Sequence, residues 1–505
     1  MHAQNATLFN AASTFPATHG ELSLRDVLTI EDDDALLALC VTPARIPVWS
    51  QIRVVLLRMI MSDLLYGTTL TSQSTGRVSR AKAASTMVRS LVHNAIHGHL
   101  RTNKATVCVM GDGVANQWVD GRWTNRLTDP FVDVLPERTV VVEDHFEWRW
   151  PFPRKHPNVL FHAPFQAMNV LRGKLDVREH HRKDAVRIVD LAAERGTRFL
   201  DWKLDDVRRA RLVDMLAAKM ASMPTQYQAY RKLLCRIEPR LLLVGAGCYG
   251  PAASLIAAAR SLGIVTAEYQ HGAVSSGHDA YNFAPALLNS EAYRRTLPDY
   301  FLSFGNWWGQ QFNAPVRKIS IGSPHRARQL EHAAAPATPA QRDTLLILSD
   351  GVDFDLYLDL ATRVLPAASR AGLKVALRPH PLERTKVGQL TNIPRDRIEI
   401  DVRPNIYGSL ARSRVVVSEV STVLFEAIGI ADAILIWDTP KARFAYPEHP
   451  FSTFASPDDL TALLDSGAVD RLQPDVPSGE IWQDGWEARY AQFITLACDS
   501  NSGNA

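Results

Sequence analysis

The sequence predicts an α/β protein with two doubly wound parallel sheets, one in each of two domains that face a cleft. Three observations predict this fold class: short apolar segments alternate with helical ones, they form two separate sets, and a stretch without a strand pattern divides the sets. Short apolar runs between helices are typical of parallel strands that are covered on both faces. The 505 residues also exceed what one compact core usually holds.

The first set lies in an N-terminal domain, expected over residues 1–325, whose beginning is largely helical. Helical periodicity also covers Val186–Ala193, Val207–Met220 and Ala252–Leu262, and Pro224 is expected to interrupt it after the second of these. The expected strands are Ala105–Met110, Arg138–Val142, Val159–His162, Arg240–Val244 and Ile264–Tyr269.

The second set follows residues 326–342, which are rich in Ala, Pro and Thr and are expected to form a linker. A second Rossmann-like domain is expected over residues 343–478. Its expected strands are Thr344–Ser349, Lys374–Leu377, Arg397–Asp401, Arg414–Ser418 and Ala433–Trp437. Residues 479–505 are expected to contain a final helix with one apolar stripe, formed by Trp482, Trp486, Tyr490 and Phe493.

Composition excludes several classes of protein. The formal net charge of +3 is too small to indicate nucleic-acid binding. The five cysteines are odd in number and no pair has CxxC spacing, so neither a disulfide framework nor a zinc site is expected. No signal-peptide pattern and no apolar run of about 20 residues is visible. A cytoplasmic protein is predicted, with peripheral association at the inner face of the membrane left open.

Polar residues cluster after the strand Ile264–Tyr269, and ligands of open α/β sheets bind at such strand ends. His271 could act as a general base near neutral pH, with Glu268 close enough in sequence to orient it or raise its pKa. The alternative is a histidine that satisfies loop carbonyls. The neighbouring residues predicted to line the cleft are Gln270, Gly272, His278 and Tyr281.

Three polar motifs follow strands of the second domain. Arg378 and His380 could contact a phosphate or a ribose, held in place by the turn that ends at Pro381. Ser421 and Thr422 could cap a helix whose free amides bind phosphate, although ordinary capping would look the same. The nucleotide site is therefore predicted from Arg378, His380, Pro381, Ser418, Ser421, Thr422, Glu426, Ser349, Asp350 and Gly351. No metal site is predicted, because the acidic spacing after Ser349 matches no calcium loop.

A competing motif is Gly245-Ala-Gly247-Cys-Tyr-Gly250, a literal G-x-G-x-x-G between a strand and a helix. With Glu268 ending the next strand, it matches a dinucleotide fingerprint. Pro251 follows at once, however, and the motif lies deep in the chain after several strands. A nicotinamide-dependent oxidoreductase is kept as an alternative function.

Together these motifs resemble GT-B transferases that build bacterial capsules and other surface polymers. His380-Pro381 and Ser421-Thr422 are similar to the motifs that bind a CMP-sugar in bacterial sialyltransferases, polysialyltransferases and Kdo transferases. His271-Gly272 is similar to a His-Gly of teichoic-acid glycerophosphate polymerases, where the histidine is regarded as the base. The sialyltransferases hold their base with an acidic-acidic-glycine motif. The nearest match here is Glu143-Asp144 followed by His145, which makes Asp144 a further catalytic candidate.

The resemblance implies a glycosyltransferase that is independent of metals and cofactors. Its substrates would be a nucleotide-sugar donor, preferably CMP-linked, held by the C-terminal domain, and a glycan or glycolipid acceptor on the N-terminal side. GT-B proteins commonly end in a helix that packs back on the N-terminal domain, which is expected of residues 479–505. Two further alternatives remain: a CDP-glycerol or CDP-ribitol phosphotransferase, and a non-catalytic binding protein in polysaccharide assembly.

Overall fold

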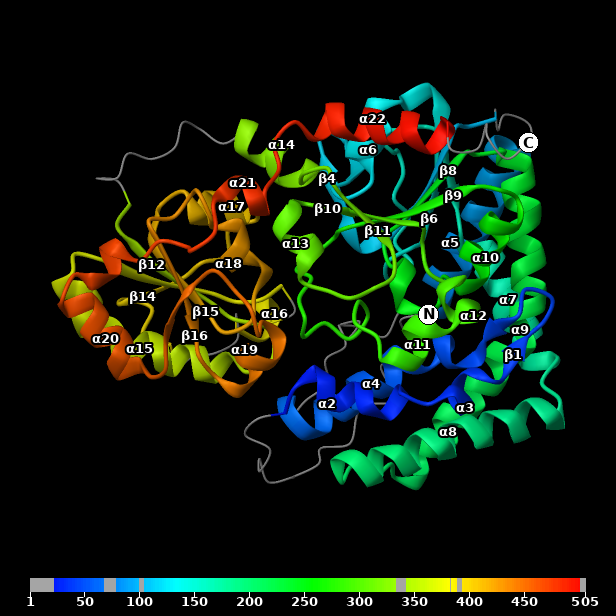
Figure 1. The fold of residues 1–505 in the computed structure, drawn as a ribbon. Helices are drawn as coiled ribbons and strands as arrows, with labels where there is room; N and C mark the ends of the chain where they lie inside the picture. The colour runs from blue at the N-terminus through cyan, green and yellow to red at the C-terminus, as the bar shows by residue number, and fades with distance from the viewer. Residues whose placement is uncertain are drawn as a thin grey trace.

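The computed structural model describes residues 22–67, 79–99, 104–332, 342–381, 383–387 and 393–499. They form two α/β domains side by side, with the C-terminal one in yellow and orange (Figure 1). The N-terminal sheet has seven strands in the order β11-β10-β9-β8-β3-β6-β7, and the C-terminal sheet six in the order β14-β13-β12-β15-β16-β17. Every pairing within both sheets is parallel. The predicted fold class is confirmed.

Each sheet is doubly wound, because chain order reverses direction in its middle. In the N-terminal sheet the reversal lies between β3 and β8, and in the C-terminal sheet between β12 and β15. Ligands of such sheets bind beyond the carboxyl ends of the strands near the reversal. The N-terminal strands are β3 (Val107–Gly111), β6 (Thr139–Glu143), β7 (Val159–Phe161), β8 (Leu241–Val244), β9 (Val265–Tyr269), β10 (Tyr300–Ser303) and β11 (Arg317–Ser320).

Two of these strands, β10 and β11, were not predicted. The edge strand β11 reads Arg-Lys-Ile-Ser and is half exposed, so it lacks the apolar run of a buried strand. The helices of this domain include α2 (Leu24–Leu28), α3 (Asp34–Leu37), α4 (Arg53–Met61), α5 (Arg80–His93), α7 (Ala163–Leu175), α8 (Glu179–Leu200), α9 (Asp206–Ile237) and α10 (Ala253–Ser261). The interruption predicted at Pro224 is wrong, because α9 continues through it with Met223 and Tyr227 buried on either side.

The C-terminal domain has a core of its own between its sheet and its covering helices. Its strands are β12 (Thr344–Leu348), β13 (Lys374–Arg378), β14 (Ile398–Ile400), β15 (Ser413–Ser418), β16 (Ala433–Trp437) and β17 (Ser452–Phe454). The helices around it include α15 (Phe354–Arg370), α17 (Ile406–Leu410), α18 (Thr422–Glu426), α19 (Pro440–Ala445) and α20 (Pro457–Asp465).

The predicted linker, residues 326–342, is partly helical. Helix α14 (Pro324–His332) occupies its beginning, with the Ser323 hydroxyl accepting from the Arg326 amide at 3.4 Å. A proline in the first helical turn and a serine before it are both typical of a helix start. Residues 333–341 lie outside the described part of the chain.

The end of the chain crosses back to the N-terminal domain, as the fold class predicted. It forms two helices, α21 (Ser478–Ile481) and α22 (Trp486–Asp499), rather than one. Between them, the Trp482 indole donates to the carbonyl of Phe425 in the C-terminal domain at 3.0 Å. Helix α22, in red, lies along the N-terminal domain (Figure 1), where Tyr490 and Phe493 join its core. Each helix of the described residues is too short or too polar to cross a membrane.

Candidate functional site

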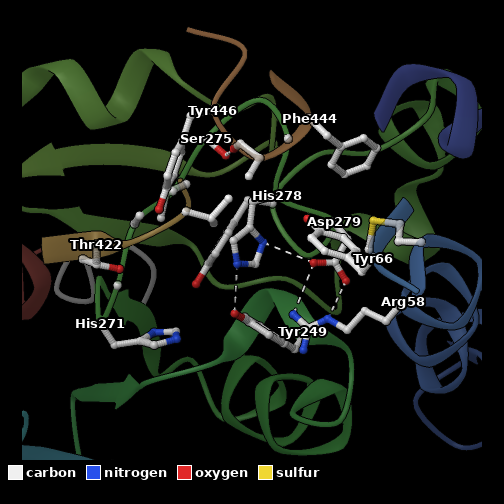
Figure 2. Close-up of a pocket in the computed structure, with 18 residues that line it drawn as sticks. Arg58, Tyr66, Tyr249, His271, Ser275, His278, Asp279, Thr422, Phe444 and Tyr446 are labelled. Carbon is white, nitrogen blue, oxygen red and sulfur yellow. Dashed lines mark hydrogen bonds and ion pairs between the residues drawn. The ribbon is translucent and has the colours of Figure 1, made fainter. Parts of the chain in front are cut away.

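A cavity of about 350 Å³ lies between the two domains, beyond the carboxyl ends of the N-terminal strands. The loop after β9 forms one wall, with His271, His278 and Asp279, and Thr422 and Tyr446 belong to the C-terminal wall (Figure 2). A smaller cavity adjoins it and shares His271, Gly272 and Thr422. The two parallel sheets therefore bring the predicted base, His271, and one predicted nucleotide-binding residue, Thr422, to the same cavity.

His271 follows β9 directly and is partly exposed to both cavities. Its Nδ1 atom is buried and meets no hydrogen-bond partner within the described residues. Burial lowers the pKa of His271 to about 4, and the positive charges of Arg126 and Arg58 act in the same direction. The imidazole is therefore neutral at pH 7 and is in the form that can accept a proton.

Glu268 lies elsewhere than predicted for a residue that orients His271. Its buried carboxylate accepts hydrogen bonds from the Tyr281 hydroxyl at 2.7 Å and from the Cys248 amide at 2.9 Å. Burial raises the pKa of Glu268 to about 7. The carboxylate thus ties the loop after β8 to the loop after β9, and its predicted role toward the imidazole has no contact to support it.

The Gly245–Gly250 turn is filled by the chain itself. A Cβ at Gly250, where φ is +95°, would lie 1.8 Å from the carbonyl oxygen of Ser50, and one at Gly245 would lie 2.6 Å from the Tyr269 hydroxyl. The Cys248 amide already donates to Glu268. A dinucleotide turn needs free amides and space for a pyrophosphate, so this geometry does not favour the oxidoreductase alternative.

The loop after β9 is held by an ion pair that the sequence analysis missed. Arg58 of α4 contacts Asp279 at 2.8 Å and lies 5.2 Å from the centre of the Tyr249 ring. Tyr249 in turn lies 3.3 Å from Nε2 of His278 (Figure 2). Burial lowers the pKa of His278 to about 4. Arg58 is the one charged residue in the otherwise apolar run Val54–Met61, and that exception was the available signal.

Gln270 shapes the turn around His271. Its side-chain amide donates to the Gly272 carbonyl at 2.9 Å and accepts from the Phe304 amide at 2.8 Å. Tyr281 is fully buried with its hydroxyl on Glu268. Both of these predicted cleft residues stabilise the loop, and Tyr281 also lines the larger cavity together with Gly272 and His278.

Asp144 directly follows β6, at the same edge of the sheet as His271. His271 follows β9, however, which is three strands away from β6 in the order β9-β8-β3-β6. Three strand spacings amount to about 14 Å. The carboxylate lies 2.8 Å from Nδ1 of His162 and accepts from Gln166 at 3.3 Å. Glu143 beside it is buried against Arg154 at 3.0 Å. Asp144 therefore stays a separate candidate that does not contact His271.

The motifs after β12 and β13 meet at one point. Glu383 accepts from the Ser349 hydroxyl at 2.6 Å and from the His380 amide at 3.0 Å. Gly351, where φ is +88°, lies against His380, since a Cβ there would be 2.8 Å from Nδ1 of the imidazole. Ser418 lies one strand further and donates to the Leu348 carbonyl at 2.9 Å. Pro381 is exposed beside this group.

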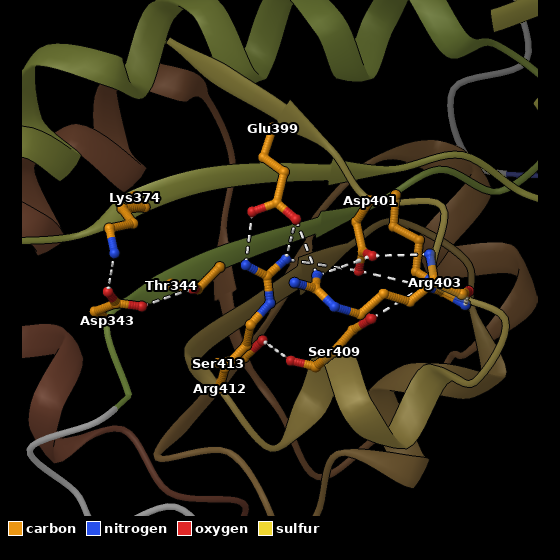
Figure 3. Close-up of polar contacts among 10 residues, drawn as sticks. Asp343, Thr344, Lys374, Glu399, Asp401, Arg403, Ser409, Arg412 and Ser413 are labelled. Carbon is orange, nitrogen blue, oxygen red and sulfur yellow. Dashed lines mark hydrogen bonds and ion pairs between the residues drawn. The ribbon is translucent and has the colours of Figure 1, made fainter. Parts of the chain in front are cut away.

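Arg378 has its own partners inside the C-terminal domain. Its guanidinium donates to Ser409 at 3.0 Å and to the Arg403 carbonyl at 2.9 Å, and it lies 3.3 Å from Asp401. Asp401, Arg403 and Ser409 belong to a network that also includes Glu399 and Arg412 (Figure 3). A phosphate-binding role would require Arg378 to leave these partners.

The third motif borders the two cavities. Ser421 accepts from the Val423 amide at 3.2 Å, which is the ordinary capping that the sequence analysis kept as an alternative. Thr422 lines both cavities, and Glu426 lines the smaller one opposite Arg126 of the N-terminal domain. Burial raises the pKa of Glu426, and the positive charge of Arg126 partly offsets this.

Two residues that were not predicted, Arg126 and Lys441, lie at the smaller cavity or contact a predicted site residue. Arg126 lines the smaller cavity, and its guanidinium has neither an ion pair nor a hydrogen bond within the described residues. Lys441 of α19 lies 2.7 Å from the buried Glu419 and 3.2 Å from Asp350, so the predicted Asp350 is already paired. Arg126 follows no predicted strand, and Lys441, four positions after the predicted strand Ala433–Trp437, belongs to none of the motifs that were singled out.

No model of a protein family and no curated protein matches this chain. Among solved structures, a UDP-N-acetylglucosamine 2-epimerase from Rickettsia bellii aligns over 79% of this chain and 99% of its own at 10% identity, with a TM-score of 0.42. The wall teichoic acid polymerase TagF aligns over 85% and 99% at 11% identity, with a TM-score of 0.41. An α,α-trehalose 6-phosphate synthase from Burkholderia multivorans aligns over 79% and 94% at 12% identity, with a TM-score of 0.36. Likeness at this level says nothing of activity, so a function for this chain has to be argued from the residues that line the cleft.

Acid should destabilise the protein between pH 6.5 and 4. Burial lowers the pKa of His145, His271, His278 and His325 to about 4, so the unfolded chain binds more protons in this range. The raised pKa values of Glu143 and Glu268, both about 7, act in the opposite sense and offset about half of the effect. For these six groups the net difference is about two protons, or about 2.7 kcal/mol of unfolding free energy per pH unit.

Urea unfolding at pH 7.5 and pH 5 measures this loss. The H325Q variant should show a shallower dependence by about one proton. Equal stability at the two pH values would contradict the expected net effect, and greater stability at pH 5 would show that these imidazoles titrate normally in the folded chain.

Proposed function

We propose that this chain is a GT-B glycosyltransferase that moves a sugar from a nucleotide-activated donor to an acceptor hydroxyl in the interdomain cavity. The observation that carries the proposal is His271, neutral and partly exposed on one wall, with Thr422 of the other domain on the same hollow. Transfer between two substrates needs a base on the acceptor and charge stabilisation on the leaving phosphate. His271 on the N-terminal wall offers the base, and Thr422 on the C-terminal wall offers a contact for the leaving phosphate.

The donor phosphate would lie where the two cavities join. Thr422 and the guanidinium of Arg126 border that place, and His325 adds a neutral imidazole. Because the part of the chain that the structure describes gives the Arg126 guanidinium no hydrogen bond or ion pair, it can bind a phosphate through two parallel hydrogen bonds. The resemblance of His380-Pro381 and Ser421-Thr422 to CMP-sugar motifs supports a cytidine nucleotide.

The acceptor would occupy the larger cavity. Its lining includes the aromatic residues Tyr66, Tyr249, Phe444 and Tyr446, which offer flat apolar surfaces with polar tips. Such surfaces suit a sugar, whose ring faces are apolar and whose edge carries hydroxyl groups. A surface glycan or glycolipid is the acceptor class we propose.

Phosphotransfer from a CDP-linked glycerol or ribitol is the second candidate, favoured by the His271-Gly272 resemblance. It would use the same base and the same phosphate groups, so geometry does not separate the two. Analysis of the acceptor product would separate them. Glycosyl transfer from a CMP-sugar leaves a product without phosphorus, whereas phosphotransfer from a CDP-linked alcohol places a phosphodiester in the product, and both reactions release CMP.

A thermal-shift panel of CMP, CDP, UDP and NAD tests the proposal first. A cytidine nucleotide at a hundred times its dissociation constant should add about 2.7 kcal/mol of stability, and the shift should shrink in R126Q and T422V. The K203Q variant changes a cation outside both cavities and serves as control. A shift with NAD alone would overturn the assignment. Hydrolysis or transfer of a bound donor would then separate an enzyme from a silent binding protein.

A further inference from the structure

Helix α5 buries three of its polar residues and exposes most of its large apolar ones. Thr86, Ser90 and His93 are buried, with exposed fractions of 4%, 0% and 8%. The outward residues Val88, Leu91, Val92 and Ile96 are between 49% and 58% exposed, with Ile96 in the helical turn that continues α5. A surface helix of a globular protein ordinarily shows the reverse pattern.

The inward polar residues have a structural reason, because α5 covers the edge strand β7. Nε2 of His93 lies 2.8 Å from the Val159 carbonyl. Asn94 donates to the Phe161 carbonyl at 2.7 Å and accepts from the Phe161 amide at 2.9 Å. An open strand edge needs such partners. This explains the inner face of the helix, but nothing in it requires the outer face to be apolar.

Helix α7 extends the apolar surface, since it is a neighbour of α5. It packs on α9 through Gly173, where a Cβ would lie 2.8 Å from the Ala218 carbonyl. Met168, Leu171 and Leu175 of α7 are between 57% and 73% exposed. Phe152, 48% exposed, adjoins α5 through the ring of His93 at 5.8 Å. We call this surface the α5–α7 face: Val88, Leu91, Val92, Ile96, Phe152, Met168, Val170, Leu171 and Leu175.

The charges on helices α5 and α7 themselves have a single sign. Residues 79–99 and 163–175 contain Arg80, Lys82, Arg89, Arg172 and Lys174, and neither stretch contains an aspartate or a glutamate. The whole chain has nearly equal numbers of both signs, 56 basic and 53 acidic residues. The absence of acids is therefore a local property of these two helices.

We propose that the α5–α7 face docks on the surface of an anionic lipid bilayer. Exposed leucine, valine and phenylalanine side chains enter the boundary between headgroups and acyl chains, and basic side chains beside them attract anionic headgroups. A partner protein would ordinarily match cations with its own acids at defined positions, whereas a lipid surface needs only apolar residues and positive charge. Helices α7 and α9 lie on the side of the molecule away from the C-terminal domain (Figure 1), so docking leaves that domain in solution.

The face also connects to the edge of the sheet that opens on the cleft. His145, whose Nε2 lies 2.7 Å from the Ser90 hydroxyl of α5, directly follows Asp144 at the carboxyl end of β6. Docking through this face would hold the cleft-side edge of the N-terminal sheet near the membrane. This inference does not depend on the proposed transferase activity.

Cosedimentation of the full chain with vesicles tests the proposal. Binding is expected to vesicles of phosphatidylcholine mixed with phosphatidylglycerol, and to be much weaker with phosphatidylcholine alone. The V88S/V92S and L171S/L175S pairs should each lower the partition coefficient about tenfold or more. The R172Q/K174Q pair should lower binding to the anionic vesicles and reduce its sensitivity to salt.

The controls are V207S and V402S, because these valines are 60% exposed, as much as the tested ones, and lie outside the α5–α7 face. Both should bind vesicles as the parent chain does. The proposal fails if the parent chain stays in the supernatant with anionic vesicles, or if the serine pairs bind as the parent does. It also fails if the serine pairs instead dissociate a dimer in sedimentation velocity, because the face would then serve a second copy of the chain.

Discussion

Replacing His271 with alanine should lower the turnover number about 10²–10⁴-fold, the usual contribution of a positioned general base. Donor affinity should persist, since the proposed phosphate contacts come from Thr422 and Arg126. Because burial keeps the pKa of His271 at about 4, the base form is present throughout the neutral range. The acid limb of the pH–rate profile should therefore fall near pH 4 to 5, well below the ordinary range of a histidine.

The kinetic measurement needs a neighbouring control. His278 lies on the same loop and its pKa is lowered to the same value, but Nε2 lies 3.3 Å from the Tyr249 hydroxyl. H278Q can keep that contact and should retain most of the turnover. Near-normal turnover in H271A would remove His271 as the base and direct attention to Asp144.

Replacing Arg53 with leucine should cost about 3–5 kcal/mol of unfolding free energy, the range for removing one partner of a buried ion pair. Arg53 is 1% exposed and binds both carboxylate oxygens of Glu31, at 2.5 and 2.8 Å. It also donates to the backbone carbonyls of Asp279 and Asn282. Its loss leaves a buried carboxylate unpaired and frees the loop whose Asp279 holds Arg58 at the cavity.

A matched control is R295L, which removes an arginine from the exposed pair with Glu291, where the side chains are 65% and 70% exposed. Exposed pairs contribute about 1 kcal/mol or less. Urea unfolding of both variants and of E31Q/R53L gives the comparison, and the double variant should lose less than the sum of its single changes. If R53L costs no more than R295L, the buried pair does not hold the loop.

The strand-end residues of the site were predictable because hydrophobic periodicity is visible in the sequence. Each of the predicted strands is present, and in parallel sheets their carboxyl ends meet at one edge. His271 and Thr422 were predicted in this way, and both line the interdomain cavity. Arg126 and Arg58, which line the same cavities, were not predicted, because Arg58 lies within a helix and Arg126 follows a short hairpin strand, Arg122–Asn125, that has no apolar run.

The sequence by itself determined the fold class, the two sheets and the strand ends that border the cleft, because alternation of apolar and helical segments is a local property. Only the tertiary structure decided how charged groups pair. Arg53 meets Glu31 across 22 positions and Asp279 across 226. The Arg378 guanidinium contacts Asp401 and Ser409 inside its own domain, although the sequence had predicted it to face a ligand. Helix α5 likewise faces its polar side inward because β7 lies beneath it. A buried charge or amide takes the nearest partner that the topology supplies, and that partner is set by the packing of distant elements.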